Sequence, residues 1–427
     1  MKPYSEYKQS GVEWIGKLPL EWNRTKLKFD VIIKARVGWQ NLRTEEFIDE
    51  GAYCITGTDF KDGKICWKNA YHVSEERYEV DTHIQVKEGD LLITKDGTIG
   101  KLALIDVLPD KACLNSGIFV VRPKSTKLST KYLYWVLSSS LFSHFIDLHS
   151  TGSTIIHLYQ NVFEKLDIPF PDIFTQNEVS RYLNKETIKI DNLISEKENF
   201  IKLLQEKRQT LISHVASKGL ISNLPIKEVP FTKYLSEQSD YRGKTPNKTD
   251  SGVLLVTARN IKMGFIDYEC SKEYIAEADY EEVMRRGLPN IGDLLFTTEA
   301  PLGNVALVDN DSIALAQRVI RFRTNENYLN SKYIVLLMQS DYFQNQIKKL
   351  AQGITAQGIK ASKLNQLKVY LPTLEDQSKI IQHVKDKNSR IDSLVAETEK
   401  SIELLKEHRT ALISAAVTGK IDVREVA

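Results

Sequence analysis

The sequence predicts an α+β protein in which two tandem α/β, mainly β, domains are separated and joined by two long antiparallel coiled-coil helices, with a pseudo-twofold relation between the halves. Three observations predict this fold: an internal repeat at a constant offset of 201 residues, short β-rich runs early in each half, and a long helical pattern at the end of each half. With 427 residues, of which 42% are hydrophobic, the chain is large enough to bury the cores of several domains.

The internal repeat is the strongest of these observations. Residues 131–214 align with residues 332–415 without a gap, and 23 of the 84 aligned positions are identical. Further upstream, GDLLITKDGTIG at 89–100 corresponds to GDLLFTTEAPLG at 292–303. The chain is therefore a tandem duplication, and we expect both halves to share one folding plan.

The first part of each half has the pattern of a β-rich domain. Runs such as LLIT, IFVVR, VLLVT and VIRFR are rich in β-branched and aromatic residues, and Gly, Asp and Asn turn signals separate them. They predict one globular domain over residues 1–174 and a second over residues 220–374.

The last part of each half has a helical period. Thr175 and Glu178 stand at the spacing of an N-cap and its N3 partner, which predicts a first spacer helix over 175–219; the second spacer helix, with the C-terminal tail, covers 375–427. A helix of some 40 residues is about 60 Å long, so each helix must bury its apolar stripe against another long helix. The predicted positions of the helix–helix core are Val179, Leu183, Ile190, Leu193, Leu204, Leu211, Ile380, Val384, Ile391, Leu394, Leu405 and Leu412.

Composition limits the class of protein. The 58 basic and 56 acidic residues give a net charge of +2, which excludes a histone-like chain and confines any nucleic-acid site to a local patch. No apolar run approaches the ~18 residues of a membrane helix, and the N-terminus has no apolar signal region, so we expect a cytoplasmic protein with no membrane partner. The cysteines at positions 54, 66, 113 and 270 are too scattered for a metal pair or a disulfide framework, and we expect four buried thiols and no metal.

Two domains held apart by paired helices suggest DNA as the ligand. DNA half-sites repeat at about 34 Å per helical turn, a distance that long helices can span. Each domain would read one short block of bases, with a non-specific spacer between the blocks. Because the two domains differ at most positions, the two blocks are expected to differ as well.

Several segments also resemble a known family. The opening YKQSGVEWIGKLPLEW, the two GDLL segments, the helix after TQNEV and the closing RTALISAAVTGKID resemble the specificity subunit of type I restriction-modification systems, over essentially the whole chain. The resemblance implies two variable target-recognition domains that bind a bipartite double-stranded DNA target. It further implies two modification subunits, which use S-adenosylmethionine to methylate adenine N6. Two restriction subunits, which use ATP and Mg²⁺ to translocate and cut DNA, can join such an assembly, and the sequence leaves open whether they do.

The catalytic motifs of such partners are absent from the sequence. No NPPF or NPPY run, Gly-rich FxGxG loop or PD...(D/E)xK nuclease constellation occurs. The run Gly11 to Lys17 has Walker A spacing, but Leu18 stands where a Ser or Thr would bind Mg²⁺. We therefore expect a non-catalytic subunit that holds no cofactor in this chain.

Candidate DNA contacts are polar and basic residues in predicted loops beside glycines, because phosphates need cationic donors and base edges need forked donors and acceptors. In the first domain these candidates are Arg36, Trp39, Gln40, Arg43, Lys61, Lys95, Thr98, Ser153, Thr154 and His157. In the second domain they are Arg242, Lys244, Thr245, Arg259, Asn260, Lys262, Gln317, Arg318, Thr355, Gln357 and Lys360.

Plainer interpretations stay open for these residues and for the chain. A surface Lys or Arg is commonly just solvated, Trp39 fits a core or hinge position equally well, and His157 alone is more often a hydrogen-bonded loop residue than a metal ligand. For the whole chain, the alternative is an assembly scaffold or adaptor whose two domains bind proteins. Steep loss of affinity with salt would separate a DNA complex from a protein scaffold.

Overall fold

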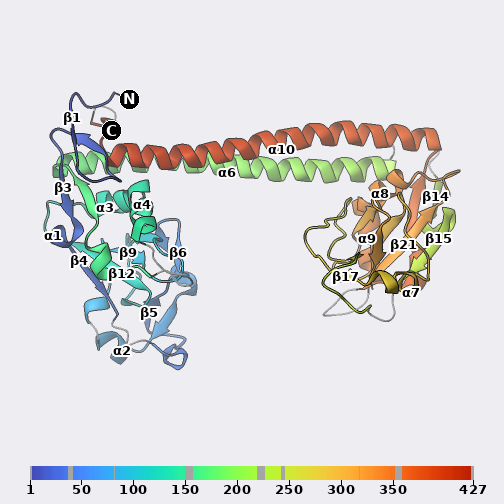
Figure 1. Cartoon of the computed structure of the whole chain (residues 1–427), viewed down its shortest axis with the longest axis horizontal. Coiled ribbons are helices and arrows are strands. Elements are labelled where there is room, and N and C mark those ends of the chain that lie inside the picture. Colours follow the sequence, from blue (N-terminus) through green and yellow to red (C-terminus); the bar gives the residue numbers. More distant parts are fainter. Residues whose placement is uncertain are drawn as a thin grey trace. The chain divides into compact units, whose positions relative to one another are not determined.

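The chain folds into two compact units in the computed structural model: residues 1–196 with 400–427, and residues 197–399 (Figure 1). The structure describes residues 2–36, 42–80, 82–149, 157–218, 227–241, 246–316, 318–351 and 358–424. The two long helices are α6 at Ile173–Lys218 and α10 at Leu374–Val417. One end of each helix belongs to the first unit and the other end to the second. Among the described residues, no helix is long and apolar enough to cross a membrane.

The first unit contains a globular domain built from short strands and short helices. Its strands are β1 Tyr7–Gln9, β2 Lys17–Pro19, β3 Asn23–Lys26, β4 Val31–Ala35, β5 Ala52–Ile55, β6 Phe60–Lys61, β7 Lys64–Ile65, β8 Tyr71–Val73, β9 Leu91–Thr94, β10 Leu102–Leu104, β11 Ala112–Leu114, β12 Ile118–Pro123 and β13 Asp167–Phe170. Its helices, beside one turn α1 at Leu27–Asp30, are α2 Glu75–Glu79, α3 Thr130–Leu137, α4 Ser140–His149 and α5 Gln160–Phe163.

The second unit contains a domain of the same kind. Its strands are β14 Lys227–Pro230, β15 Leu235–Asp240, β16 Val253–Val256, β17 Tyr274–Ile275, β18 Leu294–Thr297, β19 Val305–Leu307, β20 Ile313–Leu315, β21 Val319–Thr324 and β22 Lys368–Leu371. Its helices are α7 Tyr280–Val283, α8 Ser331–Gln339 and α9 Asp341–Leu350.

The sheets confirm that one folding plan is used twice. An antiparallel four-stranded sheet has the order β10-β9-β12-β4 in the first domain and β19-β18-β21-β15 in the second. A three-stranded sheet, with one parallel and one antiparallel pairing, has the order β11-β5-β8 and then β20-β16-β17. Even the register repeats, since Cys113 faces Cys54 and Ala314 faces Leu255 at an offset of 201. The predicted pair of mainly β domains is confirmed.

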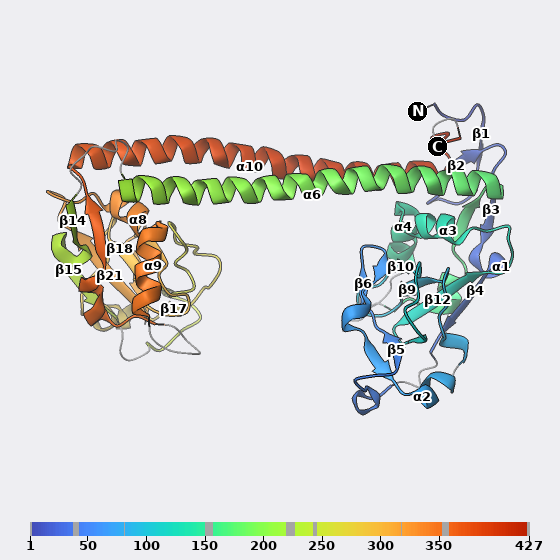
Figure 2. The ribbon, with the colours of Figure 1, turned by 180° about the vertical axis from the view of Figure 1, so that it is seen from behind.

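Each domain packs against the start of one long helix and the end of the other. In the first unit, the core around Phe119 and Phe145 includes Leu183 near the beginning of α6 and Val417 at the end of α10. The second unit reverses these roles, because its core includes the last turns of α6 and the first turns of α10, for example Val384. Within each unit the two helices therefore run antiparallel, as predicted (Figures 1 and 2).

Duplicated glutamines tie each domain to the helix that follows it. The buried Gln176 accepts the backbone N–H of Ser129 at 2.8 Å and donates to the carbonyl oxygens of Lys127 and Pro171 at 2.9 Å. Gln377 makes the same three bonds in the second unit, at 2.8–3.0 Å. The amide satisfies backbone groups that would otherwise be buried without partners, so it fixes the start of each helix.

The predicted N-cap Thr175 is wrong by three residues. α6 begins at Ile173, and the carboxylate of Asp172 accepts the Thr175 N–H at 3.1 Å and its hydroxyl at 2.6 Å. Burial alone would raise the pKa of Asp172, but these bonds lower it below its ordinary value. Asp and Thr both cap helices, and the acidic residue stands one turn earlier.

The helix–helix seam differs from the prediction at two positions. Leu193 and Leu394 are 45% and 42% exposed, while their neighbours Ile194 and Val395 turn inward. The 4-then-3 spacing from Leu183 passes through positions 187, 190 and 194, so position 193 falls outside the seam. The predicted core positions that are buried are Val179, Leu183, Ile190, Leu204, Ile380, Val384 and Ile391, and those that are half-buried are Leu211, Leu405 and Leu412.

Two of the four cysteines also differ from the prediction. Cys54 and Cys113 are buried, but Cys66 and Cys270 are exposed. The described residues contain no cluster of His, Cys, Asp and Glu that could hold a metal ion.

Candidate nucleic-acid interface

A tight turn after the central strand of each three-stranded sheet begins the candidate interface. In the first domain, Thr56 donates its backbone N–H and its hydroxyl to the carboxylate of Asp59, at 2.7 and 2.9 Å. In the second, Thr257 makes the same two bonds to the amide oxygen of Asn260, at 3.0 and 2.9 Å. The turn is held from within, which leaves its middle residues, Thr58 and Arg259, to face outward.

A second loop follows the strand that carries each GDLL segment. Thr94 donates its hydroxyl to the Thr98 carbonyl at 2.6 Å and accepts the Lys101 N–H at 3.0 Å. Thr297 likewise accepts the Asn304 N–H at 2.9 Å. One threonine in each domain thus closes the loop, so the intervening side chains project from a fixed backbone.

Further backbone bonds join the loop after each GDLL strand to two other segments: a third loop, which ends just before β12 or β21, and a segment that follows helix α4 or α9 in the sequence. The Lys95 N–H donates to the Gly117 carbonyl at 2.8 Å, and the Leu158 N–H donates to the Lys95 carbonyl at 2.9 Å. The corresponding bonds of Thr298, to Arg318 and from Ile359, are 2.9 and 3.1 Å.

These segments form one surface in each domain. We call them the first loop cluster, residues 56–59, 94–101, 115–117 and 157–158, and the second loop cluster, residues 257–260, 297–304, 316, 318 and 358–360. Both are loop surfaces held by hydrogen bonds on a sheet scaffold, the kind of site at which binding residues concentrate.

The first loop cluster carries a charged network. Asp96 accepts hydrogen bonds from Nζ of Lys95 at 3.1 Å and from Nδ1 of His157 at 2.7 Å. Burial raises the pKa of Asp96, but the bonds from His157 and Lys95 outweigh it and leave the pKa below its ordinary value. The carboxylate therefore stays ionised and holds both side chains in place at the surface.

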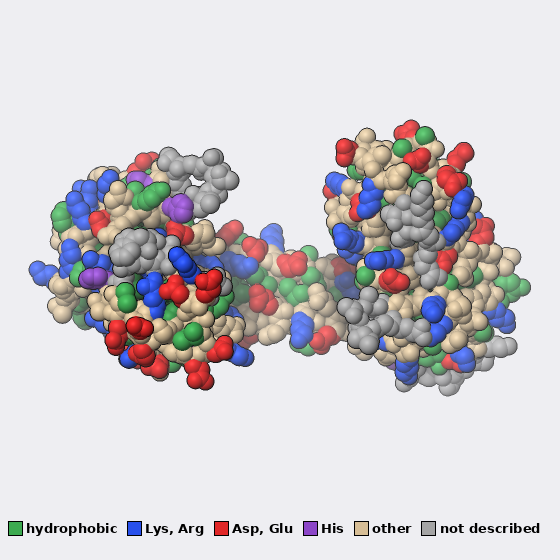
Figure 3. All heavy atoms as spheres, turned by 90° about the horizontal axis from the view of Figure 1, so that it is seen from below, with side chains coloured by type: hydrophobic (Ala, Val, Ile, Leu, Met, Phe, Trp, Pro, Cys, Tyr) green, Lys and Arg blue, Asp and Glu red, His purple; other side chains and the backbone are tan. Residues whose placement is uncertain are grey.

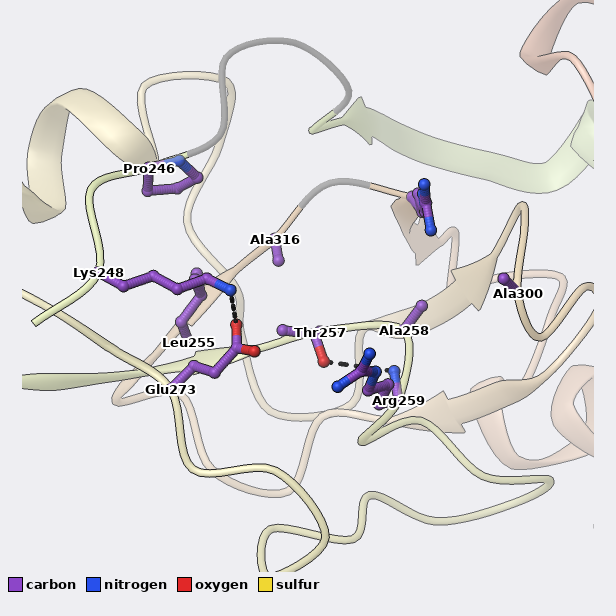
Figure 4. A pocket seen from close by; sticks show the side chains of 10 residues that line it. Pro246, Lys248, Leu255, Thr257, Ala258, Arg259, Glu273, Ala300 and Ala316 are labelled. Carbon is purple, nitrogen blue, oxygen red and sulfur yellow. Dashed lines mark hydrogen bonds and ion pairs between the residues drawn. The ribbon is translucent and has the colours of Figure 1, made fainter. Parts of the chain in front are cut away.

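The second loop cluster borders a hollow of about 310 Å³. Apolar residues such as Leu255, Ala258 and Ala316 line part of it, and Arg259 and Arg318 contribute two guanidinium groups. Figure 4 shows Lys248 reaching Glu273, an ion pair of 2.7 Å, and Arg259 beside Thr257. A hollow with apolar residues in part of its lining and two forked guanidinium groups suits a planar, polar group such as a base edge.

The structure brings several predicted residues together and separates others. Lys95, Thr98 and His157 lie in the first loop cluster, and Arg259, Arg318 and Lys360 lie in the second. Lys262 follows the turn at 257–260, and its Nζ donates a hydrogen bond to the Arg259 carbonyl at 2.8 Å. Exposed positions outside the clusters are Arg43 and Lys61.

Two predicted contacts are buried and have structural partners. Arg36 is 3% exposed and donates from Nε to the Leu114 carbonyl at 3.0 Å, so it supports the third loop from inside. Asn260 is completely buried, because its amide donates inward to the Asp267 and Ser271 carbonyls at 3.0 and 2.8 Å. The expectation that these two side chains lie at the surface is wrong.

The remaining predictions fall on residues outside the described part of the chain. They are Trp39, Gln40, Ser153, Thr154, Arg242, Lys244, Thr245, Gln317, Thr355 and Gln357.

The acidic members of both clusters were missed by sequence reasoning, which searched for cations and amides. Asp96 and Glu299 occupy the same position of the two GDLL segments, so the repeat alignment itself carried the signal. Each carboxylate holds a cation, but from different loops: His157 and Lys95 in one domain, and Arg318 in the other. Across the visible face of both units, basic and acidic side chains are interspersed (Figure 3), in keeping with local sites rather than one basic surface.

Comparisons with known proteins point in one direction. A profile described as "Type I restriction modification DNA specificity domain" matches residues 21–203 and 239–404. The MjaVIII specificity subunit of a type I restriction enzyme from Methanocaldococcus jannaschii is 24% identical over 397 residues, which cover 88% of each chain. The putative MjaX specificity subunit from the same organism is 22% identical and covers 96% of each chain.

Solved structures show the same fold. A chain from a study of complex assembly and conformational transition of the type I R-M system aligns with a TM-score of 0.71 at 14% identity, covering 95% of this chain and 99% of that one. The HsdS subunit from Thermoanaerobacter tengcongensis aligns with a TM-score of 0.54 at 13% identity, covering 95% and 98%.

Proposed function

The chain belongs to the type I restriction modification DNA specificity family, and from this premise we propose that it is the subunit that recognises a bipartite DNA target. Each domain reads one short block of bases through its loop cluster. The observation that carries the proposal is that two loop frameworks, held by matching hydrogen bonds, present different side chains at corresponding positions. Thr58, Lys95 and Gly117 in the first cluster correspond to Arg259, Thr298 and Arg318 in the second.

This difference gives the two blocks different sequences. Base edges in the major groove are distinguished by their patterns of donors, acceptors and methyl groups, so loops of one shape with different side chains read different bases. Cations such as Lys95 and Lys360 also supply contacts to phosphates, which position a protein on the duplex without specifying sequence.

The catalytic steps belong to partner subunits in this proposal. Two modification subunits, one for each half of the duplication, use S-adenosylmethionine to methylate adenine N6, and restriction subunits that use ATP and Mg²⁺ complete the assembly. This chain supplies recognition and placement. The arrangement of α6 and α10 supports two modification subunits, because each unit contains the start of one long helix beside the end of the other and so presents an equivalent surface.

The direct test maps methylated adenines across a genome with and without the chain, in each case with its modification subunit. The expected result is one bipartite sequence, two unlike blocks with a fixed spacer, that is methylated only when the chain is present. Methylation that persists without the chain, or that has no second block, would overturn the proposal.

A domain exchange tests the assignment of one block to each domain. Replacing residues 20–170 by the corresponding region of another family member should change one block and leave the other unchanged. If both blocks change together, the domains do not read independently.

Salt dependence tests the contact with DNA against an assembly scaffold, which the comparisons do not favour. The logarithm of the binding constant for the target should fall linearly with the logarithm of the salt concentration, because basic side chains that bind the phosphates release the counterions of the DNA. If the chain is a protein scaffold, the complex should bind DNA only weakly, and its affinity for the mapped sequence should show no such dependence on salt.

A further inference from the structure

Arg318 stands out within the second loop cluster for the way in which it is held. Its Nε lies 3.4 Å from a carboxylate oxygen of Glu299, and this side chain is 55% exposed. No hydrogen bond joins its two terminal nitrogens to any residue in the described part of the chain. The carboxylate thus orients the guanidinium and leaves two parallel donors free at the edge of the hollow.

The backbone fixes the same residue. The Arg318 carbonyl accepts the N–H of Thr298 at 2.9 Å and its hydroxyl at 3.2 Å, so two bonds hold the loop beside Glu299. The φ of Arg318 is +70°, a backbone conformation that residues other than Gly, Asn and Asp seldom adopt. An arginine in this conformation costs stability that a glycine would not, so the side chain is kept at the expense of local backbone energy.

The corresponding residue of the first domain lacks this group. Gly117 occupies the position of Arg318, and its carbonyl accepts the Lys95 N–H just as Arg318 accepts that of Thr298. The same backbone bond therefore forms without an arginine, at a glycine that does not share the positive φ of Arg318. The guanidinium is not needed for this bond.

We infer that Arg318, oriented by Glu299, reads a guanine in the block recognised by the second domain. A guanidinium with two free parallel N–H groups matches O6 and N7 of guanine in the major groove, whereas adenine offers only one acceptor there beside a donor. A contact to phosphate would need charge but no fixed orientation, whereas the ion pair with Glu299 offsets part of the positive charge and draws Nε to one side. Glu299 is a positioning residue, because it acts through Arg318.

This inference rests on the proposed function, and the test separates the two. The methylation map is repeated in the complex with Arg318→Gly, which restores the residue of the first domain and suits the observed φ. The expected result is a single guanine position, in the block that survives exchange of residues 20–170, at which other bases become accepted. The preference for guanine over other bases at that position should decrease by a factor of about 5 to about 150, and every other position should keep its preference.

The remaining outcomes each decide against the inference or against its premise. An unchanged sequence in the variant, a wild-type second block without guanine, or a uniform loss of binding at all sequences would overturn the role of Arg318 while leaving the bipartite map intact. The absence of any bipartite map in the wild type would instead overturn the proposed function.

Two further variants exclude unfolding as the cause. Glu299→Gln keeps the arginine but weakens its orientation, so it should relax the same position by a smaller factor. Arg285→Ala removes an exposed arginine that pairs with Glu282 at 2.8 Å outside the cluster, and it should leave the map unchanged. Relaxation at several positions by Arg285→Ala would show that any lost surface arginine blurs recognition.

Discussion

Arg409 of α10 donates from Nε to a carboxylate oxygen of Asp191 of α6 at 2.9 Å. The second unit contains the repeat-related pair with the helices exchanged, Arg208 of α6 with Asp392 of α10. The same arginine in each copy meets the same aspartate of the other copy. Reciprocal pairing of this kind is what a duplicated helix forms when it runs antiparallel to its own repeat, and it fixes the register in which the copies meet.

Charge reversal tests this register in the first unit. Arg409→Glu places two carboxylates together and should lower the free energy of unfolding by about 0.5–1 kcal/mol, a modest amount because both side chains are partly exposed. Adding Asp191→Arg restores opposite charges and should recover most of the loss, as measured by thermal unfolding at low salt. A double variant as unstable as the sum of the single variants would contradict the pairing.

Two neighbouring positions of α6 test the helix–helix seam. Ile190 is buried, so Ile190→Ala should lower the free energy of unfolding by about 2–5 kcal/mol. Leu193 faces solvent, so Leu193→Ala should change the free energy by less than about 0.5 kcal/mol. Urea denaturation of both variants makes the comparison, and equal losses would place Leu193 in the seam after all.

The sequence predicted the repeat, the mainly β domains and the antiparallel long helices because each rests on a pattern that extends over many residues. The phase of the seam rests on single positions. Leu193 and Ile194 are adjacent apolar residues, as are Phe200 and Ile201, so either member of each pair continues a spacing of three or four. Only the packing against the partner helix decides between them.

The candidate site was predictable in part for a similar reason. The sequence singled out the loops beside the GDLL segments, and the structure places Arg259, Arg318, Lys95 and His157 in the two loop clusters. The direction of a side chain depends on tertiary bonds that no local pattern shows. Asn260 resembles a surface turn residue in sequence, yet the carbonyl oxygens of a neighbouring loop draw its amide inward.

A buried ion cluster in the second domain offers a test of stability. Asp293 and Arg321 are 2% and 1% exposed at their side chains and lie 2.8 Å apart, and Arg323 binds the same carboxylate through two nitrogens. Asp293→Asn leaves the buried guanidinium of Arg321 with only the half-exposed Glu237, 2.9 Å away, as a carboxylate partner. It should cost about 3 kcal/mol in the unfolding of the second unit, the lower end of the range for breaking a buried ion pair.

The first domain supplies the matched control. Asp90 binds Arg122 in the same bidentate way as Asp293 binds Arg323, at 2.7 and 2.6 Å, and both arginines keep about a quarter of their side chains exposed. The first domain has Val120 where the second has the buried Arg321, so Asp90 neutralises no buried arginine. Asp90→Asn should therefore cost less than Asp293→Asn when chemical denaturation of the two variants is compared. A larger loss from Asp90→Asn would show that burial of the arginine does not set the size of the effect.

Acid should weaken the same cluster. Burial alone would raise the pKa of Asp293, but hydrogen bonds from Arg323 and Arg321 lower it below the ordinary value of 3.8. The unfolded chain then takes up the proton before the folded chain does, so the stabilisation is complete above about pH 5 and is lost as the pH falls below the ordinary value towards the folded one. Unfolding free energies measured between pH 3 and pH 7 should fall more steeply at the acid end for the wild type than for Asp293→Asn, which has no carboxyl group to titrate at this position. Parallel pH profiles for the two proteins would show that the pKa of Asp293 is the same in the folded and unfolded states.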